Sequence, residues 1–291
     1  MNRVLLFLGV AFAVGGAVIL AAMLVPAWRG TAKMLWRFYR SEFLIVGAFL
    51  LPAFAGGWWF LALLLAMAAR GQWELLALFG WRLDAWLPLG TLAAGLSLVA
   101  LAMLAPVYLP AALALAFAVL AVTALADQRH LRGQTLTPAA SLVFPVLPLL
   151  AMALLRPETN GFLWLFLAQA VVEANDSFAL LVGKLIGRRK ILPRLSPGKT
   201  LEGLVAGLLA GGMAGFLIGR HMLELEAAHA LLVTGTALAA GLAGDLLLSA
   251  LKRARGVKDF RPIATLHGGL LDIYDSLLFA VPALFVLRAM I

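Results

Sequence analysis

Residues 231–250 read LLVTGTALAAGLAGDLLLSA, twenty residues in which Asp245 is the one charged side chain. An α-helix of about this length crosses the hydrocarbon core of a bilayer. Similar apolar runs recur, and the segments that we expect to cross a membrane are 4–25, 43–55, 57–69, 87–105, 107–126, 137–155, 161–182, 204–220, 231–250 and 271–290. The sequence therefore predicts an all-α fold, a polytopic transmembrane helical bundle with about ten spans.

The composition agrees with this fold class. Hydrophobic residues make up 64% of the 291 residues and charged residues 13%, a balance that a water-soluble domain could not enclose in one core. We therefore treat residues 1–291 as a single integral membrane domain. The chain has no cysteine, which excludes disulfides and thiolate metal sites. The net charge of +9 does not indicate a nucleic-acid partner, because the basic residues fall between apolar runs.

The placement of the basic residues predicts the topology. Of the 23 lysines and arginines, all but Arg3, Arg156, Arg220 and Arg288 fall in alternate loops of the ten-span arrangement. Such loops face the cytoplasm, so both termini are expected outside it. The arrangement requires a helix break near Gly56, where one long tilted helix is the alternative. We expect the first span to be retained, because no small-residue cleavage region follows it.

Ionisable side chains inside predicted spans point to a functional site, because placing a charge in lipid costs several kcal/mol. The polar residues of this kind lie after residue 170 and are Glu173, Asn175, Asp176, Asp245, Asp272 and Asp275. The first half of the chain is expected to hold nothing comparable.

Asp272 and Asp275 are three residues apart at the start of the last predicted span. On one helix their Cβ atoms would lie about 5–6 Å apart on a common face. A hard divalent cation such as Mg²⁺, bound also by nucleotide phosphates, would compensate the two charges, and Asp245 could supply a third oxygen ligand. The simpler alternative is that these carboxylates pair with Lys252, Arg253 or Lys258.

Two predicted cytoplasmic loops are rich in glycine and basic residues. In the first, Ser196-Pro197-Gly198-Lys199-Thr200 precedes a predicted helix, and a helix N-terminus beside a lysine forms a phosphate cradle. The loop could equally rest on anionic lipid headgroups. In the second, His267-Gly268-Gly269 precedes Asp272. The two glycines would allow a ligand to approach the backbone closely, and we assign His267 to binding without a proton-transfer role.

The segment from Gly244 to Ser276 resembles the motif of CDP-diacylglycerol synthases, also called phosphatidate cytidylyltransferases. The matching residues are Gly244-Asp245-Leu246, Ser249, Lys252-Arg253, Lys258-Asp259, His267-Gly268-Gly269, Leu271-Asp272 and Asp275-Ser276. A second match comprises Asp176, Gly183, Gly187, Pro193, Ser196–Thr200 and Glu202-Gly203. Together the matches cover roughly residues 172–276.

The resemblance implies Mg²⁺-dependent transfer of CMP from CTP to a phosphatidate-type lipid, with a second cation such as K⁺ and a homodimeric assembly. Residues 1–160 would then be mainly scaffold and 161–291 the catalytic part, in a bacterial inner membrane with the site facing the cytoplasm. The expected catalytic residues are Asp245, Lys252, Asp272 and Asp275, of which the three aspartates would bind metal. The expected substrate-binding residues are Asp176, Ser196, Lys199, Ser249, Arg253, Lys258, Asp259, His267, Gly268 and Gly269.

The chain departs from the family pattern at a few positions. Ile273 stands where arginine is common, Leu248 where glutamate is common, Thr265-Leu266 where proline-glycine is usual, and Phe178 in place of a glycine. The lost arginine removes a bidentate phosphate contact, which leaves two alternatives open. One is a CTP-dependent transferase with another lipid acceptor, and the other is a transporter or assembly partner built on the same scaffold.

Overall fold

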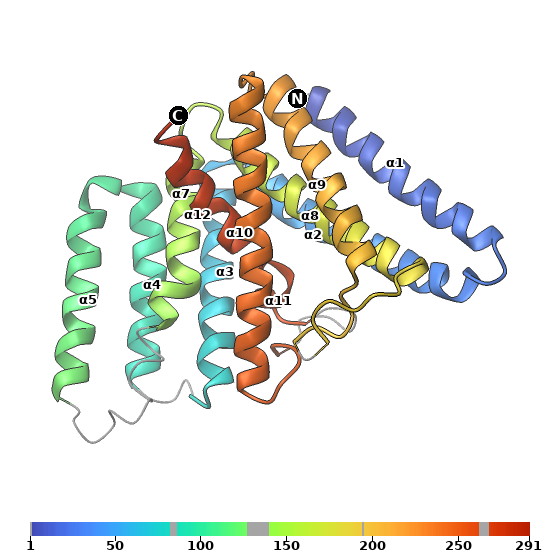
Figure 1. Cartoon of the computed structure of the whole chain (residues 1–291). Coiled ribbons are helices and arrows are strands. Elements are labelled where there is room, and N and C mark those ends of the chain that lie inside the picture. The colour runs from blue at the N-terminus through green and yellow to red at the C-terminus, as the bar shows by residue number, and fades with distance from the viewer. Residues whose placement is uncertain (1, 82–85, 127–139, 194, 262–267) are drawn as a thin grey trace. The chain divides into compact units, whose positions relative to one another are not determined.

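The computed structural model describes residues 2–81, 86–126, 140–193, 195–261 and 268–291. These residues are mostly helical (Figure 1). In chain order the helices are α1 (Asn2–Leu24), α2 (Arg29–Ala55), α3 (Gly57–Leu78), α4 (Trp86–Leu104), η1 (Pro106–Tyr108), α5 (Leu109–Ala126), η2 (Leu142–Val146), α7 (Leu147–Leu155), α8 (Gly161–Leu185), α9 (Leu201–His221), α10 (Ala227–Ala254), α11 (Leu270–Ile273) and α12 (Leu277–Arg288).

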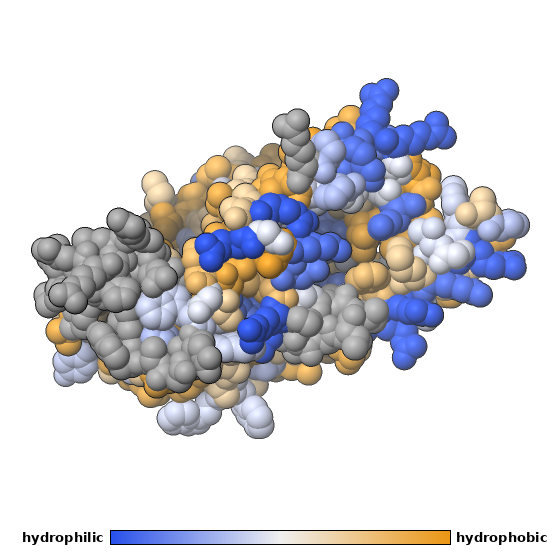
Figure 2. Space-filling view, turned by 90° about the horizontal axis from the view of Figure 1, so that it is seen from below, coloured by the Kyte–Doolittle hydropathy of each residue, from blue (hydrophilic) through white to orange (hydrophobic). Residues whose placement is uncertain are grey.

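The predicted all-α membrane fold is confirmed. Within the described ranges, six helices are long and apolar enough to cross a membrane: α1, α2, α3, α8, α9 and α10. Four shorter apolar helical stretches cover Pro88–Leu104, Pro106–Ala116, Leu142–Leu155 and Leu277–Arg288. The number of about ten spans therefore stays a prediction. Large apolar side chains such as Leu44, Leu51 and Trp58 are exposed, as expected of a lipid-facing surface, and Figure 2 shows apolar and strongly hydrophilic residues exposed side by side on one face.

The expected helix break at Gly56 is confirmed. Gly56 has a φ of +68°, a left-handed backbone conformation that glycine adopts without steric cost. Arg156 donates hydrogen bonds to the carbonyl oxygens of Ala53 and Phe54, which have no partner within the helix that ends there. The guanidinium therefore caps the end of α2 and fixes the turn into α3.

The predicted start of the second span was wrong. The sequence favoured a loop up to residue 42, whereas α2 begins at Arg29. Ala32 and Leu35 are buried, while Lys33, Arg37 and Arg40 occupy other positions of the same turns. This spacing is that of an amphipathic helix. The basic residues that were predicted to lie in a loop therefore lie on the first turns of α2.

The chain divides into two compact units. One comprises Met1–Leu51 and Gln169–Leu238, and the other Pro52–Ala168 and Ala239–Ile291. In the second unit, α4 packs against α3 and α7, α12 packs against α7, and α11 contacts α3. This unit also contains the C-terminal half of α10, so it carries most of the predicted site residues.

In the first unit, glycines of α9 face the backbone of α8. A Cβ added at Gly207 would lie 2.5 Å from the carbonyl oxygen of Asn175, and one at Gly211 would lie 2.8 Å from that of Val171. Small residues at four-residue spacing allow helices to approach this closely in membranes. The glycines therefore let α9 contact the polar stretch of α8 that contains Asn175 and Asp176.

We expect Gly207→Ala to destabilise the protein by about 1–3 kcal/mol, the usual cost of overpacking a tight contact. Gly212→Ala is the matched control on the same helix, because nothing lies within 4 Å of its added Cβ. Thermal unfolding in detergent measures both. Equal stability of the two variants would contradict the close packing of α8 and α9.

The last predicted span is not one continuous helix. It was expected to carry Asp272 and Asp275 on a common helical face, but α11 ends at Ile273 and α12 begins at Leu277. The Asp275 carboxylate accepts hydrogen bonds from the backbone N–H of Ser276 at 2.6 Å and from its hydroxyl at 3.2 Å. Such local side-chain bonds compete with helical hydrogen bonds, so Asp275 lies in the turn between the two helices.

Candidate active site

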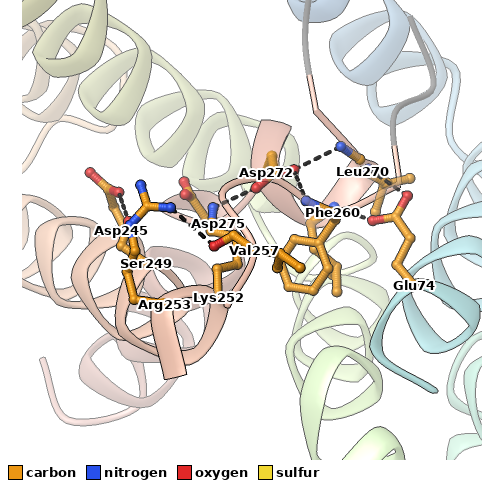
Figure 3. Close-up of polar contacts among 12 residues, drawn as sticks. Glu74, Asp245, Ser249, Lys252, Arg253, Val257, Phe260, Leu270, Asp272 and Asp275 are labelled. Atoms are coloured by element: carbon orange, nitrogen blue, oxygen red, sulfur yellow. Dashed lines mark hydrogen bonds and ion pairs between the residues drawn. The ribbon is translucent and has the colours of Figure 1, made fainter. Parts of the chain in front are cut away.

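The C-terminal part of α10 carries four of the predicted site residues. Asp245, Ser249 and Lys252 recur at helical spacing, which places them along one side of α10. The Ser249 hydroxyl donates to the Asp245 carboxylate at 3.3 Å, and Arg253 donates to the carbonyl oxygen of Val257 at 3.0 Å (Figure 3). Helical periodicity therefore gathers Asp245, Ser249 and Lys252, which the sequence predicted as site residues, on one side of α10.

Lys252 and Asp272 form an ion pair across the second unit. The ammonium nitrogen of Lys252 lies 2.5 Å from Oδ1 of Asp272, and their side chains are 8% and 10% exposed. The same ammonium lies 5.5 Å from the centre of the Phe260 ring. Of the possible partners Lys252, Arg253 and Lys258, Asp272 thus pairs with Lys252. The Lys252 ammonium group is therefore bound to a carboxylate and is not exposed to bind a phosphate.

The second oxygen of Asp272 binds backbone. Oδ2 accepts a hydrogen bond from the N–H of Phe260 at 2.7 Å and from that of Gly269 at 2.8 Å (Figure 3). Hydrogen bonds to an ionised carboxylate are stronger than neutral ones. Asp272 therefore joins three segments, namely α10 through Lys252, the segment after α10 through Phe260, and its own N-terminal turn through Gly269.

The two glycines of the His-Gly-Gly sequence face carboxylates of the chain. A Cβ at Gly268 would collide with Oδ2 of Asp272, and one at Gly269 would collide with Oε2 of Glu74. Close approach to the backbone was predicted for a ligand, and in the structure carboxylates of the protein make that approach. His267 lies outside the described residues.

Glu74 is a site residue that the sequence did not reveal. It lies in α3, which extends to Leu78 rather than ending at residue 69, and it is 1% exposed. Its carboxylate accepts hydrogen bonds from the N–H groups of Leu270 and Leu271 at 2.8 and 2.9 Å. The expectation that the first half holds no comparable carboxylate was wrong. The available signal was Arg70, four residues before Glu74, since this spacing favours an ion pair on a helix.

The remaining predicted residues of the second unit lie nearer the surface. Arg253, Lys258 and Asp259 are exposed, and Asp245 and Asp275 are half-buried. Leu248 is buried. It stands where glutamate is common in the family pattern, so an apolar side chain occupies this buried position.

In the first unit, the loop around Ser196 and Lys199 precedes a helix as predicted. Thr200 caps α9 by accepting the N–H of Gly203 at 3.1 Å. The Glu202 carboxylate accepts the N–H groups of Arg188 and Arg189, which ties the beginning of the loop to its end. Asp176 lies on α8, where it accepts a hydrogen bond from Asn175 at 2.8 Å.

The donor types of the second unit suit a hard cation. Asp245, Asp272 and Asp275 offer carboxylate oxygens, the ligands that Mg²⁺ prefers, and Mg²⁺ commonly takes one or two carboxylates together with substrate phosphates. In the ranges that the structure describes, no three acidic or histidine side chains gather as a metal cluster. A cation here would therefore need phosphate oxygens to complete its coordination.

Comparison with known proteins identifies the family. The model of the cytidylyltransferase family matches residues 37–291, which is most of the chain. The chain belongs to the cytidylyltransferase family. This confirms the resemblance inferred from the motif between Gly244 and Ser276.

Individual bacterial proteins are also similar to part of the chain. An uncharacterised protein of Escherichia coli, YnbB, is 43% identical over 138 residues, which are 46% of each chain. The phosphatidate cytidylyltransferase of Bacillus subtilis is 40% identical over 134 residues, 46% of this chain and 50% of the relative. That of Aquifex aeolicus is 32% identical over 146 residues, 50% of this chain and 54% of the relative. The matched region therefore spans about half the length of these relatives.

Proposed function

We propose that the protein transfers CMP from CTP to a phosphatidate-type lipid, giving CDP-diacylglycerol and pyrophosphate. The observation that carries the proposal is the Lys252–Asp272 pair, held by backbone N–H groups of Phe260 and Gly269, in a membrane protein of the cytidylyltransferase family. Phosphatidate cytidylyltransferases of two bacteria share 32–40% identity with about half of the chain. The lipid would keep its acyl chains in the bilayer while its headgroup reaches the site.

The reaction balances without a further reactant. A phosphate oxygen of the lipid attacks the α-phosphorus of CTP, the bond from that phosphorus to the bridging oxygen breaks, and pyrophosphate leaves with the electron pair. Transfers of this kind need mainly positioning and neutralisation of charge. Arg253 and Lys258, which are exposed at and just after the end of α10, would bind phosphates of the nucleotide. Lys199 and Ser196, in the loop before α9, stay proposed substrate-binding residues on the basis of the sequence motif.

Asp245, Asp272 and Asp275 would hold Mg²⁺ only together with phosphate oxygens of CTP, because the described residues do not gather three such side chains as a metal cluster; K⁺ would be a second cation. When bound, Mg²⁺ supplies positive charge that neutralises the phosphate oxygens. Asp272 accepts three hydrogen bonds in the structure, and a carboxylate has about four acceptor positions. Counted over the described residues, these bonds leave about one acceptor position, so Asp272 would still be able to hold a cation while Lys252 keeps the carboxylate oriented.

The proposed setting is the inner membrane of a bacterium, with about ten spans and the site on the cytoplasmic side. CTP is a cytoplasmic nucleotide, and the segment from Lys252 to Arg261 contains five basic residues, as expected of a cytoplasmic loop. Cysteine-accessibility mapping at Lys258 and Glu224 would test this orientation, because the two positions are predicted on opposite sides.

A panel of acceptors tests the reaction. Purified protein should release pyrophosphate from CTP when phosphatidate and Mg²⁺ are both present, and the release should fall to background when EDTA is added. Parallel reactions with a polyprenyl phosphate and with lysophosphatidate define the acceptor class. If pyrophosphate is released only with another lipid phosphate, that lipid replaces phosphatidate as the proposed acceptor. If pyrophosphate is released with none of the lipids, a transporter or an assembly partner is favoured instead.

A further inference from the structure

Glu74 is a buried carboxylate whose two oxygens are both engaged. Oε1 accepts from the N–H of Leu270 at 2.8 Å and from Nε of Arg70 at 2.6 Å, and Oε2 accepts from the N–H of Leu271 at 2.9 Å. Its side chain is inaccessible to solvent. A buried charge is tolerated only when it is paired and hydrogen-bonded, and these three contacts meet that requirement.

The contacts of Glu74 hold the backbone directly before Asp272. Leu270 and Leu271 open α11, and the next residue supplies the carboxylate that meets Lys252 (Figure 3). A helix of four residues has little stability of its own. Its position must therefore come from contacts with other parts of the unit, which include burial of Leu270 and Leu271, the Glu74 carboxylate at its N–H groups and Asp272 at the preceding turn.

Arg70 extends this set of contacts to the segment after α10. Besides its bond to Glu74, Arg70 donates to the carbonyl oxygen of Arg261 at 2.6 Å. The guanidinium groups of Arg70 and Arg261 lie 4.4 and 5.3 Å from the centre of the Trp73 ring. One turn of α3 thus binds both Arg261, which follows α10, and the start of α11 at Leu270 and Leu271.

From these contacts we infer that Glu74 is a positioning residue, which fixes α11 and so sets where the Asp272 carboxylate meets Lys252. Its effect on catalysis rests on the proposed function, whereas its effect on the backbone does not. Glutamine at this position keeps the size of the side chain but offers one acceptor oxygen, and its NH₂ group would face a backbone donor. Aspartate keeps the charge and is one methylene shorter.

The test combines hydrogen exchange with kinetics. In Glu74→Gln, the peptide containing Leu270 and Leu271 should exchange its amide hydrogens faster than in the wild type, because one of the two N–H groups loses its acceptor and faces the NH₂ group instead. The ratio kcat/KM for CTP should fall about 10–100-fold, as is usual when a group that orients a ligand-binding side chain is lost. The KM for the lipid should stay near the wild-type value, and Glu74→Asp should recover part of the loss.

Glu158→Gln is the matched control. It makes the same chemical change in an ion pair of the same unit, where Glu158 meets Arg288 at 3.3 Å and is 51% exposed. Wild-type exchange and kinetics are expected for it. If Glu74→Gln does not purify, Glu74→Asp carries the test, because its shorter carboxylate cannot reach both N–H groups in their present places.

The outcomes separate this inference from the proposed function. Faster exchange confined to the Leu270–Leu271 peptide, with a higher KM for CTP, supports the positioning role. Unchanged exchange of this peptide overturns it, and so does a lower kcat in which both KM values and the exchange stay as in the wild type, since a smaller folded fraction would explain that loss. If the wild type shows no CTP-dependent activity but Glu74→Gln still loosens this peptide, the proposed function fails and the backbone role of Glu74 stands.

Discussion

Asp272→Asn is expected to lower CTP-dependent turnover by about a thousandfold, the upper range for removal of one oriented electrostatic group. The Asp272 carboxylate pairs with Lys252 and accepts two backbone N–H groups. An asparagine can accept with its single amide oxygen but cannot neutralise the ammonium group. Because Lys252 is 7% exposed, its charge would remain buried without compensation, which costs about 3–5 kcal/mol of stability.

The double variant Lys252→Met/Asp272→Asn distinguishes the two effects. Removing the uncompensated lysine should restore part of the lost stability, measured by thermal unfolding in detergent, while turnover stays at the level of the single variant. Recovery of turnover along with stability would show that Asp272 acts only on folding. Wild-type turnover of Asp272→Asn would contradict the site altogether.

Gly268→Ala is expected to reduce turnover about 10–100-fold, as for other groups that orient a functional side chain. A Cβ at this position would overlap Oδ2 of Asp272, so the carboxylate must move away from the N–H groups of Phe260 and Gly269. The measurement is the initial rate of CDP-lipid formation. Gly90→Ala is the control, because its added Cβ meets nothing within 4 Å.

A further readout shows whether Gly268→Ala acts through Asp272. The amides of Phe260 and Gly269 should lose protection from hydrogen exchange together with the loss of turnover. Normal turnover in Gly268→Ala, or lost turnover with both amides still protected, would contradict the assignment of Gly268 as the position that admits this carboxylate.

Much of the fold followed from local sequence. Apolar runs near the bilayer thickness predicted the helices, and Gly56 predicted the break between α2 and α3, because each depends on a few adjacent residues. The cluster of Asp245, Ser249 and Lys252 was also predictable, since helical periodicity alone places these residues together. The same applies to the start of α9 after Thr200, which carries a capping side chain.

What the sequence did not reveal depends on distant contacts. Glu74 is separated from Leu270 by 196 residues, and no local pattern predicts that a carboxylate of α3 accepts backbone N–H groups of α11. The break between Asp272 and Asp275 was missed because their spacing also suits a continuous helix. The pairing of Asp272 with Lys252 remained one alternative among several, since charge alone did not distinguish Lys252 from Arg253 or Lys258.

The measurement that tests the central claim most directly follows two labels of CTP in one reaction with phosphatidate and Mg²⁺. With ³²P at the α-phosphorus, the wild type should place the label in the lipid fraction, and Asp272→Asn should not. With ³²P at the γ-phosphorus, the label should appear in pyrophosphate and stay out of the lipid. Label from the γ-position in the lipid, or none from the α-position, would contradict cytidylyl transfer at the Lys252–Asp272 site.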